Sequence, residues 1–159
     1  MSFFTDVIAK DPRFHSTSQI NDLALLEPVT RASVQAIITD AAAKGINIIV
    51  GETYRSTERQ QLLFTKGATK LRTVGVHHYG LACDLWIEHN GQVDWHADYM
   101  VLGPLAKAHN LVWGYDWGTP NQPHTFRDID HVQRCSINRQ PSLFNGSWYP
   151  DANYNPLGD

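Results

Sequence analysis

Several features that would point to common protein classes are scarce or missing in this sequence of 159 residues. It holds two cysteines, Cys83 and Cys135, which is too few for a disulfide scaffold, although a single bridge between them is left open. The net charge of −3 offers no basic face, so a nucleic-acid partner is not expected. No apolar run reaches the roughly 18 residues of a membrane-spanning helix, so membrane insertion is not expected either.

Signal-peptide features are also missing from the first residues, MSFFTDVIAKDPRF, which have neither a basic start nor a long apolar core. The sequence therefore predicts synthesis in the cytoplasm without a signal peptide. The composition, with 42% hydrophobic and 18% charged residues, is that of a folded protein. The length predicts one domain over 1–159, with its core at about 28–134 between an irregular N-terminal segment and a C-terminal tail that wraps the surface or frays.

Hydrophobic periodicity and turn signals outline a chain of helices and strands. Helices are predicted over 28–44, 57–66 and 97–109. Strands are predicted over 46–50, 81–88, 111–113 and 129–134, and Asn90-Gly91 predicts a hairpin turn after the second of them. Thr57 and Gln60 fit a capping box, while Gly103-Pro104 predicts that the third helix starts late or kinks. The predicted fold is α+β, a small antiparallel sheet flanked by helices.

One stretch, Val76–Leu85, places a histidine and an aspartate seven residues apart. This odd spacing keeps His77 and Asp84 from facing the same way along one straight strand. His77 is therefore expected in the loop before the strand, with Gly80 allowing the chain to turn. Cys83 lies inside the stretch and is interpreted as a small buried thiol rather than a metal ligand.

A second cluster, further along the chain, contains Asp128, Asp130 and His131. Two histidines and a carboxylate are a common ligand set for a catalytic zinc ion, which keeps a fourth position open for water. The three-residue step from Asp128 to His131 suits a bend that enters a strand. From spacing alone, ordinary surface or core histidines are an equal alternative, because the sequence has eight histidines.

The pattern His77-x-x-Gly80-x-Ala82-x-Asp84, followed by Asp128-x-x-His131, resembles the signature of the M15 zinc peptidases. That family includes the D-alanyl-D-alanine carboxypeptidases, the D-Ala-D-Ala dipeptidases and the L-alanyl-D-glutamate endopeptidases of phage endolysins. Tyr54-Arg55-Ser56, with Gln60 and Gly67, resembles the arginine segment of the family. Leu111–Trp117 resembles the Trp-Gly-Gly-Asp-Trp loop of its endolysin-like branch. The similarity covers roughly residues 30–133.

This resemblance implies a fold like that of the hedgehog domain and the D-Ala-D-Ala peptidases, with one zinc ion held by His77, Asp84 and His131. It also implies that Asp128 is the catalytic carboxylate and that Arg55 binds the substrate or the transition state. In this mechanism zinc activates a water molecule and polarises the scissile carbonyl, Asp128 transfers the proton, and Arg55 stabilises the oxyanion.

Further side chains are expected to contact the substrate without binding the metal. His78 adjoins a ligand, but only His77 keeps the seven-residue step to Asp84 on which the resemblance depends. The set expected to contribute to substrate binding is Tyr54, Ser56, His78, Trp117 and His124.

The chain departs from the family pattern at Gly75, Tyr115 and Asp130, where serine or threonine, glycine, and proline or an aromatic residue are usual. Gly75 removes a possible hydrogen bond to substrate. Asp130 places a second carboxylate beside the ligand, so the division of roles between Asp128 and Asp130 stays open.

The resemblance implies zinc-dependent cleavage of an amide bond in the stem peptide of peptidoglycan, by an L-alanyl-D-glutamate endopeptidase of the phage endolysin type. The Trp113–Trp117 loop and the missing signal peptide favour this version, since a lysis enzyme acts on the cell wall after release through a membrane pore. A D-alanyl-D-alanine carboxypeptidase is an alternative, as is a non-catalytic zinc-containing binding module like the hedgehog signalling domain. A nuclease built on His77-His78 lacks a basic surface. A monomer is expected.

Overall fold

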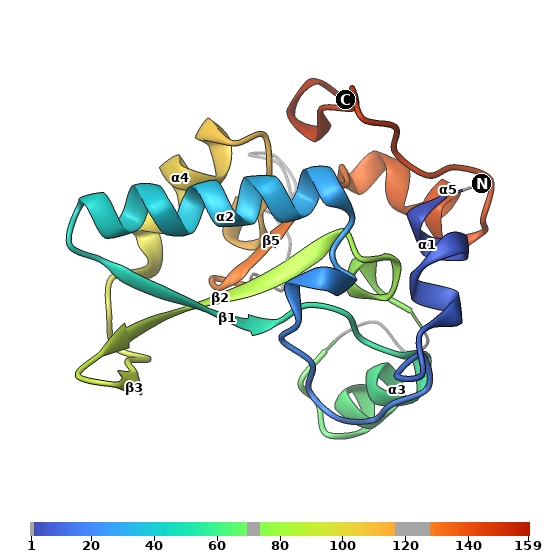
Figure 1. The fold of residues 1–159 in the computed structure, drawn as a ribbon, viewed down its shortest axis with the longest axis horizontal. Helices are drawn as coiled ribbons and strands as arrows, with labels where there is room; N and C mark the ends of the chain where they lie inside the picture. Colours follow the sequence, from blue (N-terminus) through green and yellow to red (C-terminus); the bar gives the residue numbers. More distant parts are fainter. Residues whose placement is uncertain (1, 70–73, 117–127) are drawn as a thin grey trace.

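An antiparallel sheet flanked by helices forms the centre of the molecule, in a computed structural model that describes residues 2–69, 74–116 and 128–159 (Figure 1). Its strands lie in the order β1 (Asn47–Glu52), β2 (Ala82–His89), β5 (His131–Gln133) and β4 (Val112–Trp113). A short fifth strand, β3 (Gln92–Val93), pairs with the far end of β2. The α+β fold expected from the sequence is therefore confirmed.

Two helices cover one face of this sheet and bury the main core. Helix α2 (Pro28–Ala43) runs across the strands with α4 (Leu102–Ala108) beside it (Figure 1). The alternation along β2 turns Cys83 and Leu85 toward these helices, where both are fully buried. Because strand side chains alternate between faces, Asp84 and Trp86 lie on the opposite face.

Helix α2 begins and ends where the local signals predict. Pro28 is its first residue, and the Glu27 carboxylate accepts hydrogen bonds from the backbone N–H groups of Val29 and Thr30. Gly45, just after the helix, has a φ of 77°, the left-handed conformation that glycine adopts at low energy. The Asn90-Gly91 turn is also present, with φ angles of 53° and 80°.

The remaining α-helices are short: α1 (Phe3–Asp6), α3 (Thr57–Thr65) and α5 (Gln140–Phe144). The capping box expected at Thr57 and Gln60 is corrected, because Ser56 is the N-cap of α3 and accepts from the backbone N–H of Arg59. Single 3₁₀ turns occupy Ile8–Lys10, Leu23–Leu25, Val76–Tyr79, Tyr99–Val101, Gly114–Asp116, Ile137–Arg139 and Pro156–Gly158.

The third predicted helix starts late, as Gly103-Pro104 indicated. A 3₁₀ turn at Tyr99–Val101 precedes α4, which begins at Leu102. Pro104 thus falls in the first turn, where the missing backbone N–H has no partner to lose. Gly103 lies against the indole of Trp113, so close that a Cβ at this position would be 2.9 Å from the ring.

The C-terminal tail packs against the rest of the domain. Of the two alternatives predicted for it, wrapping the surface or fraying, the structure shows the first. Arg134 is buried and its Nη2 donates to the backbone carbonyls of Asp151 and Tyr154, at 2.6 and 2.9 Å. Leu143 of α5 is 1% exposed and packs in a second apolar cluster with α1, next to which α5 lies in Figure 1. The periodicity of the tail is too irregular for these contacts to be predicted.

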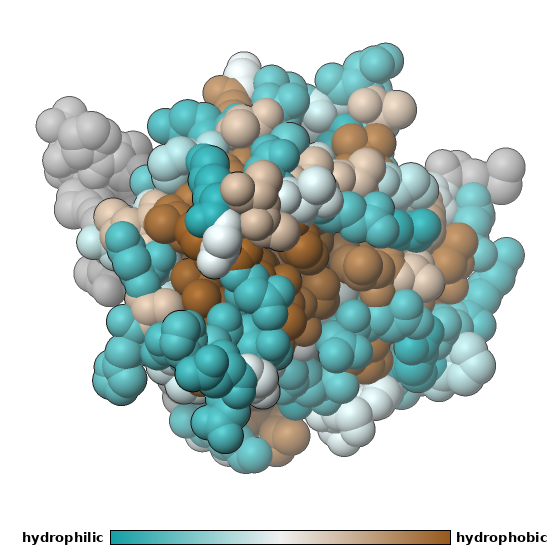
Figure 2. Space-filling model, turned by 60° about the vertical axis from the view of Figure 1, so that its left-hand side comes forward, coloured by the Kyte–Doolittle hydropathy of each residue, from teal (hydrophilic) through white to brown (hydrophobic). Residues whose placement is uncertain are grey.

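Both cysteines are free and buried, so the single bridge left open by the sequence is absent. Within the part of the chain that the structure describes, none of the helices combines the length and the apolar character needed to cross a membrane. On the face shown in Figure 2, hydrophobic surface runs across the middle and is bordered by hydrophilic residues.

Candidate metal centre and active site

On the face of the sheet that points away from α2 and α4, three neighbouring strands each contribute one polar side chain to a row. Asp84 of β2 pairs with His131 of β5 on one side and with Glu52 of β1 on the other. The pairing of β1 shifts between Val50 and Glu52, which is a bulge at Gly51. The bulge brings Glu52 opposite Asp84, whereas a regular ladder would place Gly51 there.

His77 reaches this row from a 3₁₀ turn that ends at Gly80, whose φ of 73° lets the chain reverse into β2. Its Nδ1 lies 2.7 Å from the backbone carbonyl of Thr53, which can only accept a hydrogen bond. Nδ1 therefore carries the proton, and Nε2 points its lone pair at Asp84 Oδ1, 3.3 Å away. The turn expected before the strand is present.

His131 is oriented in the same way by Gln133, two residues later on β5. The amide nitrogen of Gln133 donates to the backbone carbonyl of Cys135 at 2.6 Å, so its Oε1 faces His131 Nε2 at 2.8 Å. Nε2 must then donate, which leaves Nδ1, 3.5 Å from Asp84 Oδ1, as the nitrogen that can bind a metal. A hydrogen bond that sets the tautomer of a metal-binding histidine is a frequent outer contact of metal sites.

The donor atoms of His77, Asp84 and His131 fit a zinc ion. Tetrahedral ligands at 2.0–2.2 Å from zinc stand about 3.3–3.6 Å from one another, and the two histidine–carboxylate distances are 3.3 and 3.5 Å. Among the described residues, His77 Nε2 and Asp84 Oδ1 are buried without a hydrogen-bond partner. Unsatisfied buried atoms of this kind are rare in proteins, and a cation between them would satisfy both.

The carboxylate of Asp84 is held in the ionised form that a metal needs. Burial by itself raises the pKa of Asp84, but the interactions with His77 and His131 lower it by more, so the net pKa lies below the ordinary value. The site opens into a cleft of about 580 Å³, a volume within the range of small-ligand pockets. All three donors line this cleft.

Asp128 and Asp130 lie on the β5 side of the cleft and differ in their surroundings. Asp130 Oδ2 accepts a hydrogen bond from the indole N–H of Trp86, at 2.9 Å. Burial, followed by the hydrogen bond and charge of Asp128, raises the pKa of Asp130 to about 9. Two carboxyl groups this close do not ionise independently, so the pair holds one proton more readily than an isolated aspartate does.

The Trp113-Gly114 segment supports the turn that carries these carboxyl groups. The indole N–H of Trp113 donates to the backbone carbonyl of Ile129 at 2.7 Å. The backbone N–H of Asp128 donates to the carbonyl of Gly114, and a Cβ on Gly114 would be 2.4 Å from the Asp128 carbonyl oxygen. Glycine is therefore required at position 114 for this close backbone approach.

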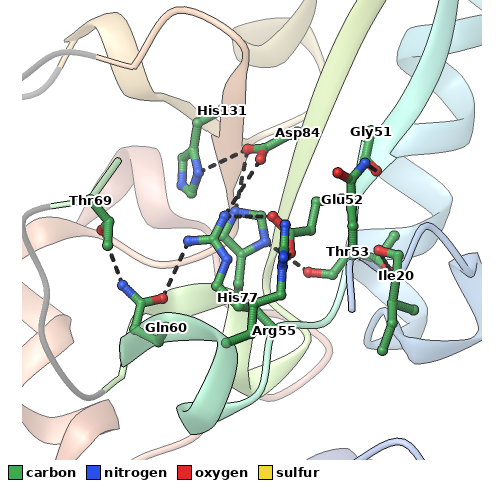
Figure 3. Close-up of polar contacts among 12 residues, drawn as sticks. Ile20, Gly51, Glu52, Thr53, Arg55, Gln60, Thr69, His77, Asp84 and His131 are labelled. Atoms are coloured by element: carbon green, nitrogen blue, oxygen red, sulfur yellow. Dashed lines mark hydrogen bonds and ion pairs between the residues drawn. The ribbon is translucent and has the colours of Figure 1, made fainter. Parts of the chain in front are cut away.

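Arg55 faces Asp84 from the β1 side of the cleft, as Figure 3 shows. Its Nη2 lies 2.7 Å from Glu52 Oε1 and 3.7 Å from Asp84 Oδ2, and its Nη1 donates to Gln60 Oε1 at 3.2 Å. Burial raises the pKa of Glu52, but the hydrogen bond from Arg55 and the charge of Arg55 lower it by more. The net pKa of Glu52 is therefore below its ordinary value. The ionised Glu52 thus holds the guanidinium in place.

Three of the expected substrate contacts have side chains that are used in packing and that lie outside the lining of the cleft. The hydroxyl of Tyr54 donates to the Phe14 carbonyl at 2.6 Å, and Ser56 caps α3 and bonds the Ser16 carbonyl. His78 is 8% exposed among aromatic rings that include Phe4, and burial lowers its pKa. The two other expected contacts, Trp117 and His124, lie outside the described residues.

Glu52, Gln133 and Arg59 also line the cleft and were not anticipated from the sequence. Glu52 faces the site only because of the bulge at Gly51, and a glycine within a strand is a weak signal for such a bulge. Gln133 follows a ligand by two residues, which places both on the same side of a strand. That spacing is the one signal that could have found it.

Replacing Gln133 with leucine is expected to weaken zinc binding by about 10- to 100-fold, because loss of an outer hydrogen bond to a ligand typically has this effect. Leucine removes the acceptor that keeps the proton of His131 on Nε2. Competition with a chromogenic chelator measures the affinity. Gln140→Leu is the matched control, since it makes the same change elsewhere in the cleft lining and should leave affinity within about twofold. Equal affinities of the two variants would contradict the assigned role of Gln133.

Similar proteins are found by sequence and by structure, although no family model matches the chain. The peptidoglycan L-alanyl-D-glutamate endopeptidase CwlK of Bacillus subtilis is 27% identical over 142 residues, covering 76% of this chain and 81% of CwlK. The L-alanyl-D-glutamate peptidase of Listeria phage A118 is 29% identical over 149 residues, covering 90% of this chain and 52% of that protein.

Solved structures share the fold at lower identity. The L-Ala D-Glu endopeptidase ChiX of Serratia marcescens has a TM-score of 0.59 at 19% identity, covering 74% of this chain and 90% of ChiX. A vancomycin-resistance D,D-pentapeptidase, VanY, solved in complex with Zn(II), has a TM-score of 0.55 at 18% identity, covering 76% of this chain and 78% of that one. These relatives and the shared fold support the resemblance of the chain to the M15 zinc peptidases, whose motif residues the fold gathers in one cleft.

Proposed function

We propose that this protein hydrolyses an amide bond in the stem peptide of peptidoglycan with the help of one zinc ion, and that the bond is the one between L-alanine and D-glutamate. The observation that carries the proposal is a pair of buried potential metal ligands without hydrogen-bond partners, His77 Nε2 and Asp84 Oδ1. Both lie beside His131 in an open cleft. The choice of bond is supported by two sequence relatives that bear this activity in their names.

The zinc ion would be held by His77, Asp84 and His131, and it supplies a Lewis acid that polarises the scissile carbonyl and acidifies a water molecule. Asp128 stands in the cleft lining as the base that takes the proton of the attacking water and delivers it to the leaving amine. Asp130 accepts the hydrogen bond of Trp86 and has a raised pKa, so the proposal assigns this role to Asp128.

Arg55 supplies a permanent positive charge on the opposite side of Asp84 from Asp128. Glu52 and Gln60 fix its guanidinium before any substrate binds. A preorganised cation stabilises the negative charge that develops on the carbonyl oxygen, and reorganisation at the moment of reaction is avoided. All five proposed site residues come from one chain, which fits an enzyme that acts as a monomer on the cell wall after release.

Two alternatives predict different products or none. A D-alanyl-D-alanine carboxypeptidase would act on the end of the stem peptide, and one structural relative, with a TM-score of 0.52, was solved with D-alanine-D-alanine bound. A non-catalytic zinc-containing module would need neither a base nor an oxyanion ligand. Asp128 and Arg55 both line the cleft beside the metal donors, which favours an enzyme.

Mass spectrometry of purified muropeptides digested by the zinc-loaded protein tests the choice of bond. The expected products carry a new N-terminal D-glutamate. Loss of only the terminal D-alanine would assign the carboxypeptidase activity instead. The same protein stripped with a chelator should leave the muropeptides intact, and added Zn²⁺ should restore the products. Intact muropeptides in every zinc-loaded digest would favour the binding module.

A further inference from the structure

Arg59 is a second arginine of the cleft, and none of the steps above uses it. It lies in α3, four residues after Arg55, with its side chain 14% exposed. Its Nε donates to Glu52 Oε2, and its Nη1 donates to the backbone carbonyl of Thr17 at 3.1 Å. No described residue bonds its third nitrogen, Nη2. Arg59 is therefore held by two fixed contacts and still has a donor for a ligand in the cleft.

The charges around Arg59 make this end of the cleft a place for an anion. Arg55 and Arg59 share the carboxylate of Glu52, and the second carboxylate beside Arg55, that of Asp84, is a proposed metal ligand. The opposite side carries Asp128, whose carboxylate would repel an anion. A planar guanidinium held at a fixed angle also matches a carboxylate, which it can bind through paired N–H donors.

A chain of three ion pairs links Arg59, through Glu52 and Arg55, to the proposed metal ligand Asp84. Arg55 contacts Asp84 at 3.7 Å, and Arg59 is the next cation along, bridged to Arg55 through Glu52. Consecutive Cα atoms are about 3.8 Å apart, so the residue after the scissile amide is the part of the substrate nearest the metal that can carry a carboxylate toward Arg59. A D-glutamate residue has two carboxyl groups, and a peptide that continues through one of them leaves the other free.

We propose that Arg59 binds the free carboxylate of the residue that follows the scissile amide and thereby selects acidic over amidated stem peptides. This inference rests on the proposed function and names a specificity residue for it. The interaction is made equally before and during the reaction, so it should act on KM rather than on kcat.

The test uses two synthetic peptides that contain L-alanyl-D-glutamate and differ only in whether the unused glutamate carboxyl group is free or amidated. The zinc-loaded full chain should cleave the free acid with a kcat/KM about tenfold higher, mainly through a lower KM, as expected for a hydrogen bond to a charged group. In Arg59→Gln the ratio of the two kcat/KM values should fall to about one. That ratio does not depend on the fraction of folded protein, so partial unfolding of the variant does not obscure the result.

Lys66→Gln is the matched control, because it removes a positive charge from the exposed end of the same helix outside the cleft lining. Its ratio should stay at the wild-type value. An unchanged ratio in Arg59→Gln, or equal cleavage of both peptides by the wild type, would overturn the role of Arg59 and leave the proposed function standing. Cleavage of neither peptide by the wild type would overturn the proposed function and this inference with it.

Discussion

Hydrolysis by Asp128→Asn is expected to be about 100- to 10,000-fold slower than by the wild type, the range associated with a positioned acid–base group. Asparagine keeps the shape of the side chain but cannot take a proton from water. Because Asp128 is not among the three proposed ligands, the variant should bind one equivalent of zinc as the wild type does. Initial rates on a stem peptide and metal analysis after dialysis measure the two quantities.

Asp130→Asn is the matched comparison for this experiment, and it resolves the roles of the two carboxyl groups. Asparagine at position 130 can still accept the hydrogen bond from Trp86, and a protonated Asp130 is already neutral near pH 7. Its hydrolysis is expected to remain within about tenfold of the wild type. A large loss in Asp130→Asn together with a small loss in Asp128→Asn would exchange the two assignments.

Zinc binding is expected to be lost in Asp84→Asn, and hydrolysis should fall to background with it. Asp84 supplies the one negative charge of the proposed ligand set, and an amide is a much weaker ligand than a carboxylate. Zinc at about 1,000 times its dissociation constant should stabilise the folded wild type by about 4 kcal/mol, and a chelator should remove this gain. Thermal unfolding with and without zinc should show no such difference for the variant.

The surface pair of Asp40 and His109 offers the control for Asp84→Asn. Its carboxylate and imidazole are 2.6 Å apart, outside the cleft lining, so Asp40→Asn removes a similar contact without touching the metal centre. Asp40→Asn should keep both hydrolysis and the zinc-dependent rise in stability. A zinc-dependent rise of normal size in Asp84→Asn would mean that the metal binds elsewhere.

The elements with strong local signals could be predicted closely. The helix at Pro28–Ala43 has proline at its start and glycine after its end, and the Asn90-Gly91 turn has the residues that positive φ angles favour. The N-cap of α3 was misassigned because Ser56 and Thr57 are both good capping residues, and only the structure shows which side chain accepts the N–H of Arg59. The ends of helices and turns can therefore be predicted from local sequence when only one residue at the boundary has a strong capping or turn preference.

The neighbours His77 and His78 illustrate where local reasoning stops. The seven-residue step to Asp84 selects His77, and the structure does bring His77 to Asp84. The same step says nothing about His78, whose ring packs against Phe4 and Phe14 from the N-terminal segment. Contacts this far apart in the sequence depend on how the segments pack.

The class of fold, the candidate metal ligands and the family resemblance that links them could be predicted from the sequence, because residue type, spacing and turn chemistry are local properties of the chain. The tertiary structure decided how these residues act together. Strand register put Asp84 between Glu52 and His131, and it aligned Gln133 with the ring nitrogen it holds. Register and long-range packing depend on the fit of the whole core, so one bulge or one buried side chain can change which groups face the cleft.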